Sequence, residues 1–157
     1  MLLPQNQIYW SNDQTAFYLS QVVQSHHVFD LMLNTIERAD ELIVSSFAIT
    51  ETFIRRLVYA RNRIKQITLI LDFTIASRNP AMICFAAEHA DRLLLTNNHS
   101  KTIYLRDSRL EMLAVMSNNA TNNQRFESGI ILKNHPVIGL YRPLITQTIE
   151  QAAPWIS

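Results

Sequence analysis

The chain has 157 residues, enough for one domain with a buried core, and its 48% hydrophobic and 17% charged content is typical of compact globular proteins. Two glycines in the whole sequence exclude the glycine-rich phosphate loops of P-loop and Rossmann proteins. The net charge of +1 neither favours nor excludes a polyanionic partner, so any basic surface must be local.

Several features indicate a soluble, cytoplasmic protein. The lone Cys84 lies in an apolar run, AMICFAAE, which excludes a disulfide framework, fits a reducing compartment and predicts a buried thiol. No apolar run approaches the ~18–20 residues that span a bilayer, so we expect no membrane association. The opening MLLP lacks the basic and long apolar regions of a signal peptide.

The first part of the chain alternates predicted helices and strands. Residues 1–27 contain aromatic side chains but no sustained hydrophobic period, so they are a poorly predictable N-terminal extension. Apolar spacing then predicts helices, the second capped by Thr50, and near-continuous apolar runs predict buried strands. The expected elements are a helix from Val28, a strand at 42–48, a helix after Thr50, a strand at 66–73, a helix at 79–89 and a strand at 92–96.

The second part reads as consecutive strands followed by a helix. We expect strands at 99–106, 110–117 and 126–132, the first two joined as an antiparallel hairpin. After Asn134 the pattern predicts one kinked helix or two short ones, because Pro143 interrupts it. The predicted fold class is therefore α/β: a single domain over 1–157, with a mixed, largely parallel β-sheet flanked by helices on both faces.

Polar residues suited to chemistry gather where these later strands begin and end. His99 and Lys101 would share one strand face, because side chains two residues apart point the same way. A lone histidine in a strand is more often structural. A lysine beside it is expensive to bury unpaired, so an anion between the two is favoured.

Three further residues would face the same patch from neighbouring strands. Ser117 and Asn119 obey the same spacing one strand later, and Glu127 opens the next strand. With His99 and Lys101 they could hold a phosphate. The alternative for the asparagine-rich stretch, which includes Asn118, is turn chemistry, because asparagine hydrogen-bonds its own backbone.

These residues resemble the active-site signature of the phospholipase D superfamily, also called the HKD superfamily. That signature is His-x-Lys, four residues, Asp, then Gly-Ser-x-Asn and a further carboxylate; the matching segments are HSK at 99–101, SNN at 117–119 and the glutamate of RFESG. The layout around LIVSSFAIT and QITLILDF also resembles the first half of that fold. Arg106 stands in the place of the family's Asp, with Asp107 one residue later, and Met116 stands in the place of its Gly.

The resemblance implies a phosphodiesterase that needs neither a metal nor another cofactor. His99 would attack phosphorus and form a phosphohistidine. Lys101 and Asn119 would hold the non-bridging oxygens, and Ser117 would add a hydroxyl donor. Glu127 would accept a hydrogen bond from an imidazole and fix its tautomer.

This chemistry needs a second histidine as general acid, and only one His-x-Lys is present. The small single-motif members of the superfamily, which this chain resembles in length, are homodimeric nucleases. We therefore expect a homodimer with a shared site on its two-fold axis, acting as a non-specific endonuclease on DNA or RNA. The alternative is a catalytically degenerate dimer that binds nucleic acid, or serves a structural role, without cleavage.

Basic residues concentrate on the helix after the first strand and just beyond it. They are candidate contacts for a nucleic-acid backbone, which would make binding fall steeply with salt. The alternative is a solvated helix face. The candidates are Arg55, Arg56, Arg61, Arg63 and Lys65.

Overall fold

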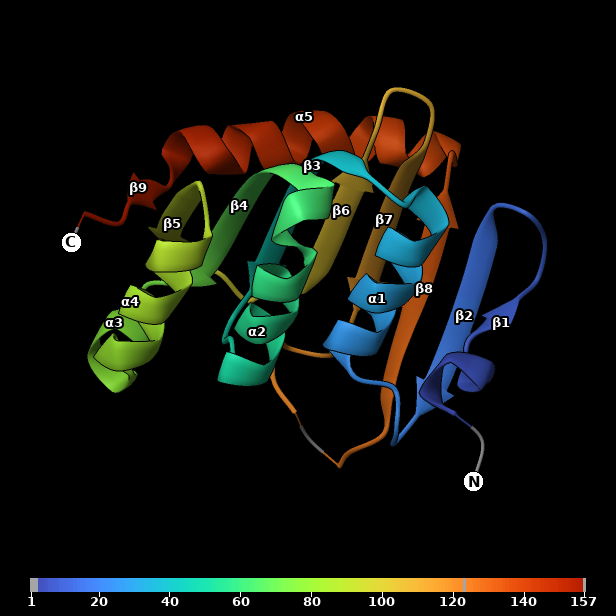
Figure 1. The fold of residues 1–157 in the computed structure, drawn as a ribbon, viewed down its shortest axis with the longest axis horizontal. Helices are drawn as coiled ribbons and strands as arrows, with labels where there is room; N and C mark the ends of the chain where they lie inside the picture. Colours follow the sequence, from blue (N-terminus) through green and yellow to red (C-terminus); the bar gives the residue numbers. More distant parts are fainter. Residues whose placement is uncertain (1–2, 123, 157) are drawn as a thin grey trace.

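The computed structural model describes residues 3–122 and 124–156, and within them one nine-stranded sheet runs in the order β1-β2-β8-β7-β6-β3-β4-β5-β9 (Figure 1). The strands are β1 (Tyr9–Trp10), β2 (Thr15–Ser20), β3 (Ala39–Ser46), β4 (Ile64–Asp72), β5 (Arg92–Thr96), β6 (Thr102–Arg106), β7 (Glu111–Met116), β8 (Glu127–Lys133) and β9 (Ala153–Pro154). The helices are α1 (Ser25–Ile36), α2 (Glu51–Ala60), α3 (Ile75–Arg78), α4 (Pro80–His89) and α5 (Pro136–Gln151), and 3-10 turns lie at Pro4–Gln7 and Arg61–Arg63.

The sheet is mixed, as predicted, but less parallel than predicted. Among the described residues only β3, β4 and β5 pair in parallel, and every other neighbouring pair is antiparallel. Helical crossovers connect the parallel strands. The strands β6, β7 and β8 follow one another without a helix, and strands joined directly pair antiparallel because a parallel partner needs a crossover.

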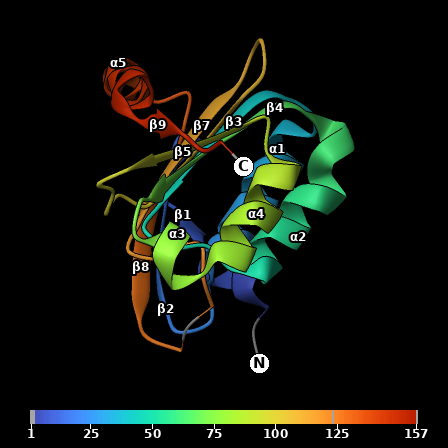
Figure 2. The ribbon, with the colours of Figure 1, turned by 90° about the vertical axis from the view of Figure 1, so that its left-hand side faces the viewer.

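Helices cover both faces of the sheet, which confirms the predicted layers. Helices α1 to α4 lie on one face and α5 crosses the other (Figure 2). The first face carries the larger apolar core, and the second a smaller one around Tyr104, Ile138 and Ile145. Within the described part of the chain, no helix is long and apolar enough to cross a bilayer.

Most predicted elements are present, with shifted ends. Strand β5 has the predicted bounds, and α4 begins after Asn79, whose side chain accepts a hydrogen bond from the Met82 amide at 3.2 Å. Cys84, predicted to be buried, is exposed on α4, because the helix turns Ile83 and Ala86 inward instead. Thr50 occupies the N-cap of α2, but its hydroxyl makes no capping bond. One helix with Pro143 inside it forms α5.

The N-terminal segment is part of the sheet. Strand β2 pairs with β8 along its whole length, from Thr15 opposite Leu132 to Ser20 opposite Glu127. Its Tyr18 is fully buried and donates a hydrogen bond to the side-chain oxygen of Asn118. Burial, and then the charge of Glu127, raise the pKa of Tyr18, so the phenol stays protonated and able to donate. The segment therefore supports the chain next to Ser117.

The two glycines give a direct test of this support. A methyl group at Gly129 would lie 2.5 Å from Cε1 and 2.7 Å from Cζ of Tyr18, whereas one at Gly139 meets nothing within 4 Å. Gly129→Ala should lower the free energy of unfolding by about 1–3 kcal/mol, because a buried ring must move. Gly139→Ala, in an exposed helix position, should raise it by about 0.5–1 kcal/mol. Urea unfolding measures both, and equal effects would contradict the packing.

Candidate active site

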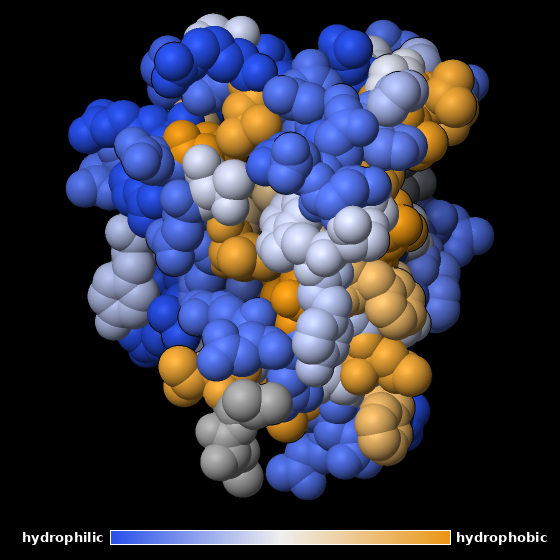
Figure 3. All heavy atoms as spheres, turned by 90° about the vertical axis from the view of Figure 1, so that its right-hand side faces the viewer, coloured by the Kyte–Doolittle hydropathy of each residue, from blue (hydrophilic) through white to orange (hydrophobic). Residues whose placement is uncertain are grey.

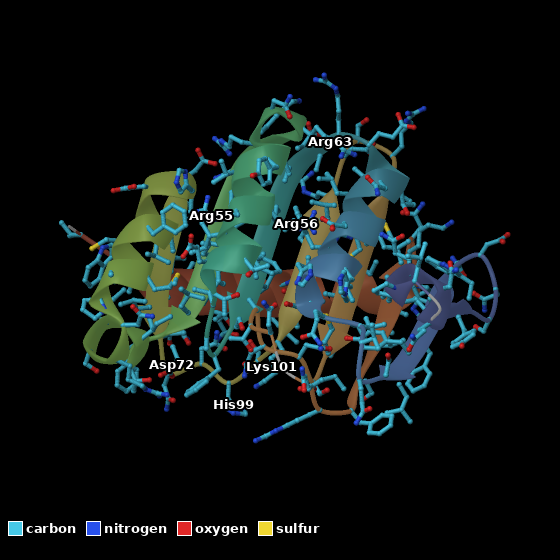
Figure 4. All side chains as sticks on the ribbon, turned by 60° about the horizontal axis from the view of Figure 1, so that its bottom comes forward. Arg55, Arg56, Arg63, Asp72, His99 and Lys101 are labelled. Carbon is cyan, nitrogen blue, oxygen red and sulfur yellow. The ribbon has the colours of Figure 1, made fainter. Side chains whose placement is uncertain are left out.

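The five candidate catalytic residues lie along one edge of the sheet. The carboxyl ends of β3, β4 and β5 meet there with the start of β6, the end of β7 and the start of β8. His99 and Lys101 lie together at this edge, beside Asp72 (Figure 4). Strand β6 begins at Thr102, so both residues stand in the loop before it rather than in the predicted strand.

His99 and Lys101 contact each other directly, whereas the sequence predicts a shared strand face with an anion between them. The Lys101 ammonium nitrogen lies 3.0 Å from His99 Nδ1 and donates to the His99 carbonyl at 2.6 Å. Burial lowers the pKa of Lys101, and the Glu127 carboxylate opposes this without cancelling it. The ring of Phe47, just after β3, lies 5.2 Å from the His99 ring, centroid to centroid. An exposed imidazole thus has a cation on one side and an aromatic ring on another.

Ser117 and Glu127 form the second half of the site. The Ser117 hydroxyl donates to Glu127 and accepts a hydrogen bond from the Ser128 amide at 3.0 Å. Strand pairing fixes this contact, because the Ser117 amide donates to the Ser128 carbonyl at 2.9 Å. Since the Glu127 charge acts on Lys101, the two halves lie within electrostatic reach of each other.

Asn119 follows in the loop after β7. Its side chain is partly exposed, and its Oδ1 is buried with no hydrogen-bond partner among the described residues. A buried amide oxygen without a donor is unusual in a folded protein. The side-chain oxygen of Asn119 is therefore not held by a hydrogen bond among the described residues, whereas the Ser117 hydroxyl is held by two.

A buried asparagine that the sequence analysis missed positions His99. The Asn98 Nδ2 lies 3.0–3.2 Å from the Ser45 hydroxyl and from the carbonyls of Ser46 and Ile70, which belong to β3 and β4. Its Oδ1 accepts from the amide of Ser100 at 2.9 Å. Asn98 therefore fastens the loop before β6 to two strands.

Asp72 completes this buried frame from the end of β4. Its Oδ2 accepts from the backbone amide of Asn98 at 3.1 Å, and its Oδ1 accepts from the backbone amide and the hydroxyl of Thr74. Burial raises the pKa of Asp72, but these hydrogen bonds outweigh burial, so the pKa is lower than usual and the carboxylate stays ionised. The sequence signal that could have revealed this buried frame is the asparagine directly before the His-x-Lys motif.

Asn118 also differs from its predicted turn role. It is buried, accepts from Tyr18 and donates from Nδ2 to the Val23 carbonyl at 3.1 Å. Two residues on, the Ala120 amide donates to the Ser46 hydroxyl at 2.9 Å. Because these bonds are buried and link distant segments, they hold the chain around Ser117 and Asn119 as a structural support, not as a local turn.

The residues that depart from the family signature have definite places. Arg106 lies at the far end of β6 from Lys101 and pairs with Glu41 at 2.8 Å. Asp107 accepts from the amides of Arg109 and Leu110, which lower its pKa, so it stabilises the β6–β7 turn. The Met116 amide donates to the Lys101 carbonyl at 3.0 Å, and its side chain packs against the larger core.

The basic residues on and after α2 already have partners. Arg55 pairs with Glu51, Arg56 with Asp30, Arg61 with Asp91 and Lys65 with Asp40, while Arg63 donates to the carbonyls of Leu33 and Glu37. Figure 4 shows Arg55, Arg56 and Arg63 along the helices, away from His99 and Lys101. Their contact with nucleic acid stays a prediction.

The remaining histidines have partners of their own. His27 Nδ1 accepts from the Gln24 amide at 3.0 Å, His135 Nδ1 accepts from the Val137 amide at 3.2 Å, and the His89 ring packs edge-on against Phe85. His26 is buried, which lowers its pKa to about 4 and keeps it neutral. Within the described ranges, no group of three or more His, Cys, Asp or Glu side chains is arranged to hold a metal ion.

Comparison with solved structures identifies the fold. A phospholipase D family member, Nuc from Salmonella typhimurium, aligns with a TM-score of 0.71 and 15% identity over 92% of this chain and 100% of its own. The fold is that of the phospholipase D family. NucT from Helicobacter pylori gives a TM-score of 0.72 and 13% identity, covering 90% of this chain and 99% of that one.

A third solved structure with the same fold is a chromatin protein. The archaeal TrmBL2, described with a novel mode of DNA binding, gives a TM-score of 0.60 and 13% identity over 92% of this chain and 55% of its own. No protein-family model matches the sequence, and no curated protein matches it. The resemblance predicted from the sequence is therefore confirmed at the level of the fold.

The role assigned to Asn98 can be tested against its neighbour. Asn98→Ala removes the amide that bonds two carbonyls and two serines, so unfolding should become easier by about 1–3 kcal/mol, and any activity that depends on His99 should fall. Asn97→Ala is the control, because Asn97 is exposed one residue away. Thermal unfolding of both variants tests this role of Asn98. An Asn98→Ala protein as stable as wild type would show that the loop needs no such anchor.

Proposed function

We propose that this protein is a metal-independent phosphodiesterase, a non-specific endonuclease that acts through a phosphohistidine at a site shared by two protomers. The observation that supports it most is the pairing of His99 with Lys101 and of Ser117 with Glu127 at one edge of a phospholipase D fold. A nucleophile, a cation and hydrogen-bond donors beside a carboxylate are the groups that phosphodiester transfer requires.

The proposed reaction has two displacements. In the first, a lone pair of the His99 imidazole attacks phosphorus while the bond to the leaving oxygen breaks, and the partner's His99 gives that oxygen a proton. In the second, water attacks the phosphohistidine, the phosphorus–nitrogen bond breaks, and the same imidazole of the partner takes the proton from water. Lys101 and Asn119 hold the charged oxygens in both steps.

The contact between Lys101 and His99 suggests how substrate would start the reaction. An ammonium group can only donate, so Lys101 near Nδ1 selects the tautomer with its proton on Nε2. A phosphate would draw the ammonium away from the ring, because a charge-assisted bond to an anion is stronger than one to a neutral ring. Nδ1 would then be free to carry the proton, and Nε2 free to attack. Glu127, on the partner or in the same chain, would accept from Nδ1.

A shared site needs a surface that brings two copies together, and the exposed apolar part of the sheet supports this proposal. Cross-strand neighbours Tyr9, Phe17, Ile130 and Val115 form a row across β1, β2, β8 and β7, with 61%, 52%, 37% and 44% of their surface exposed. Figure 3, which views the β1–β2 end of the sheet, shows apolar surface down its right-hand side. The row borders Ser117 and Glu127, so a two-fold contact through it would bring two sites together.

Nucleic acid is the proposed substrate. The residues Arg55, Arg56, Arg61, Arg63 and Lys65 remain candidate contacts for strands that extend beyond the site. Because carboxylates and carbonyls already occupy these groups, phosphates would have to displace these partners there.

The second candidate function is binding without cleavage. The backbone of Met116 is bonded to Lys101, and this methionine stands where the family signature has glycine. TrmBL2 has the same fold and is described as a DNA-binding chromatin protein. A dimer that kept the phosphate-holding residues and lost the reaction would combine these two observations.

Cleavage assays separate the two functions. Single- and double-stranded DNA and RNA are incubated with the protein in excess EDTA. Wild type should cut them, and His99→Ala should be slower by at least about 100-fold, because the nucleophile is lost. His89→Ala, a histidine on α4, is the matched control. Quenching the reactions in alkaline detergent should preserve the substrate's phosphate on His99, in a linkage that acid then cleaves. Binding without cleavage by a pure wild-type dimer would favour the second function.

The dimer surface has its own test. Phe17→Glu places a charge in the exposed row on β2, so it should turn a dimer into a monomer and reduce cleavage by about 100-fold or more as the second histidine is lost. Leu144→Glu, at a similarly exposed apolar position on α5, should change neither. Light scattering at micromolar concentration reads the mass. A monomeric wild type would overturn the shared site.

A further inference from the structure

An aromatic ring lies beside His99 and an arginine lies over that ring, and the mechanism uses neither. Phe47 follows β3 and packs against the His99 ring at 5.2 Å, while the Arg78 guanidinium carbon lies 4.7 Å from the centre of the same Phe47 ring. Arg78 is the last residue of α3 and is exposed. The order His99, Phe47, Arg78 therefore runs outward from the proposed nucleophile.

Neither residue is explained by a place in an apolar core or by an ion pair among the described residues. Phe47 is partly exposed and belongs to neither apolar core, and Phe73, which follows β4, is 53% exposed. Among the described residues Arg78 forms no ion pair, in contrast to Arg55, Arg56 and Arg61. It donates to the hydroxyl of Thr74, and the nearby Asp72 carboxylate is already bonded to Thr74 and Asn98.

We propose that Phe47 and Arg78 form a nucleotide-binding platform beside His99, which receives an unpaired base and the phosphate next to the one cleaved. Bases of single strands stack on aromatic rings and on guanidinium planes, and arginine also binds phosphate. The platform stands next to the nucleophile, where the nucleoside attached to the scissile phosphate must lie. It rests on the proposed function for its substrate.

The platform makes the site selective for single strands. In a duplex the faces of the bases are covered by their neighbours, so a stacking surface at the site gains nothing unless a base is first unstacked. The backbone charge is the same in both substrates. Phe47 is therefore a specificity residue, and Arg78 a positioning residue that acts on any strand through its charge.

The test measures binding in the His99→Ala background, so that the strand stays intact. The probes are a fluorescent oligothymidylate of about 12 nucleotides, the same strand with abasic sites, and a duplex of equal length. The His99→Ala protein should bind the thymidine strand about tenfold more tightly than the abasic strand. Adding Phe47→Leu should bring that ratio close to one and leave duplex binding unchanged.

Arg78→Ala should weaken binding of all three probes, and for the single strands it should reduce the slope of log affinity against log salt by about 0.7. Two matched controls lie elsewhere. Phe85→Leu changes a ring that packs on His89, and Arg92→Ala changes an exposed arginine at the first residue of β5, whereas the site lies beyond the last residue of that strand. Both should leave the ratio and the slope unchanged.

The results separate the platform from the function on which it rests. An unchanged thymidine-to-abasic ratio in Phe47→Leu would overturn the platform even if wild type cuts nucleic acid. If wild type cuts nothing but the ratio collapses as expected, the nuclease proposal fails and the platform stands as part of a binding protein. Thermal unfolding of Phe47→Leu and of Phe85→Leu is the control for folding, and both variants should unfold cooperatively.

Discussion

The half of the candidate site that carries His99 and Lys101 depends on one buried side-chain amide, that of Asn98. Backbone groups in a loop at a strand end must find partners, and Asn98 supplies them for the loop that carries His99 and Lys101. The same side chain bonds the end of β3, from which Phe47 projects, and its backbone amide occupies the carboxylate of Asp72. The loop of His99, the strand end before Phe47 and the carboxylate of Asp72 are thus held in one hydrogen-bonded unit. The rigidity of this unit therefore sets how firmly the loop with His99 and Lys101 is held at the surface.

Hydrophobic spacing was enough to predict most of the fold. The continuous apolar runs at β4 and β5 and the helical spacing of α1 and α2 depend on neighbours in sequence, so a pattern can reveal them. The spacing of His99 and Lys101 predicted that their side chains lie on one side of a strand, and they do lie together, although the strand begins three residues after His99. A separation of two residues brings side chains together in an extended loop as well as in a strand. Whether neighbouring strands pair in parallel or antiparallel was predicted less well, because the sequence does not reveal which distant strand each one joins.

The features missed by sequence analysis all depend on distant partners. Tyr18 and Asn118 are 100 residues apart in sequence, and nothing near either one indicates the other. Asn118 was interpreted as a turn residue because asparagine usually plays that part. Phe47 falls inside the predicted buried strand at 42–48, and only the fold reveals that its ring lies between His99 and Arg78. Local sequence predicts what a segment prefers; the partners that decide its role come from topology.

The pairing of β2 with β8 has a consequence for when the site can form. Strand β2 is made before β3 to β7, but its only long partner among the described strands, β8, is made after them. Tyr18 cannot support Asn118, and Ser117 cannot meet Glu127, before that late strand arrives. A nascent chain would therefore carry the His99 loop without the other half of the site. The topology allows the two halves of the candidate site to meet only after β8 has been made.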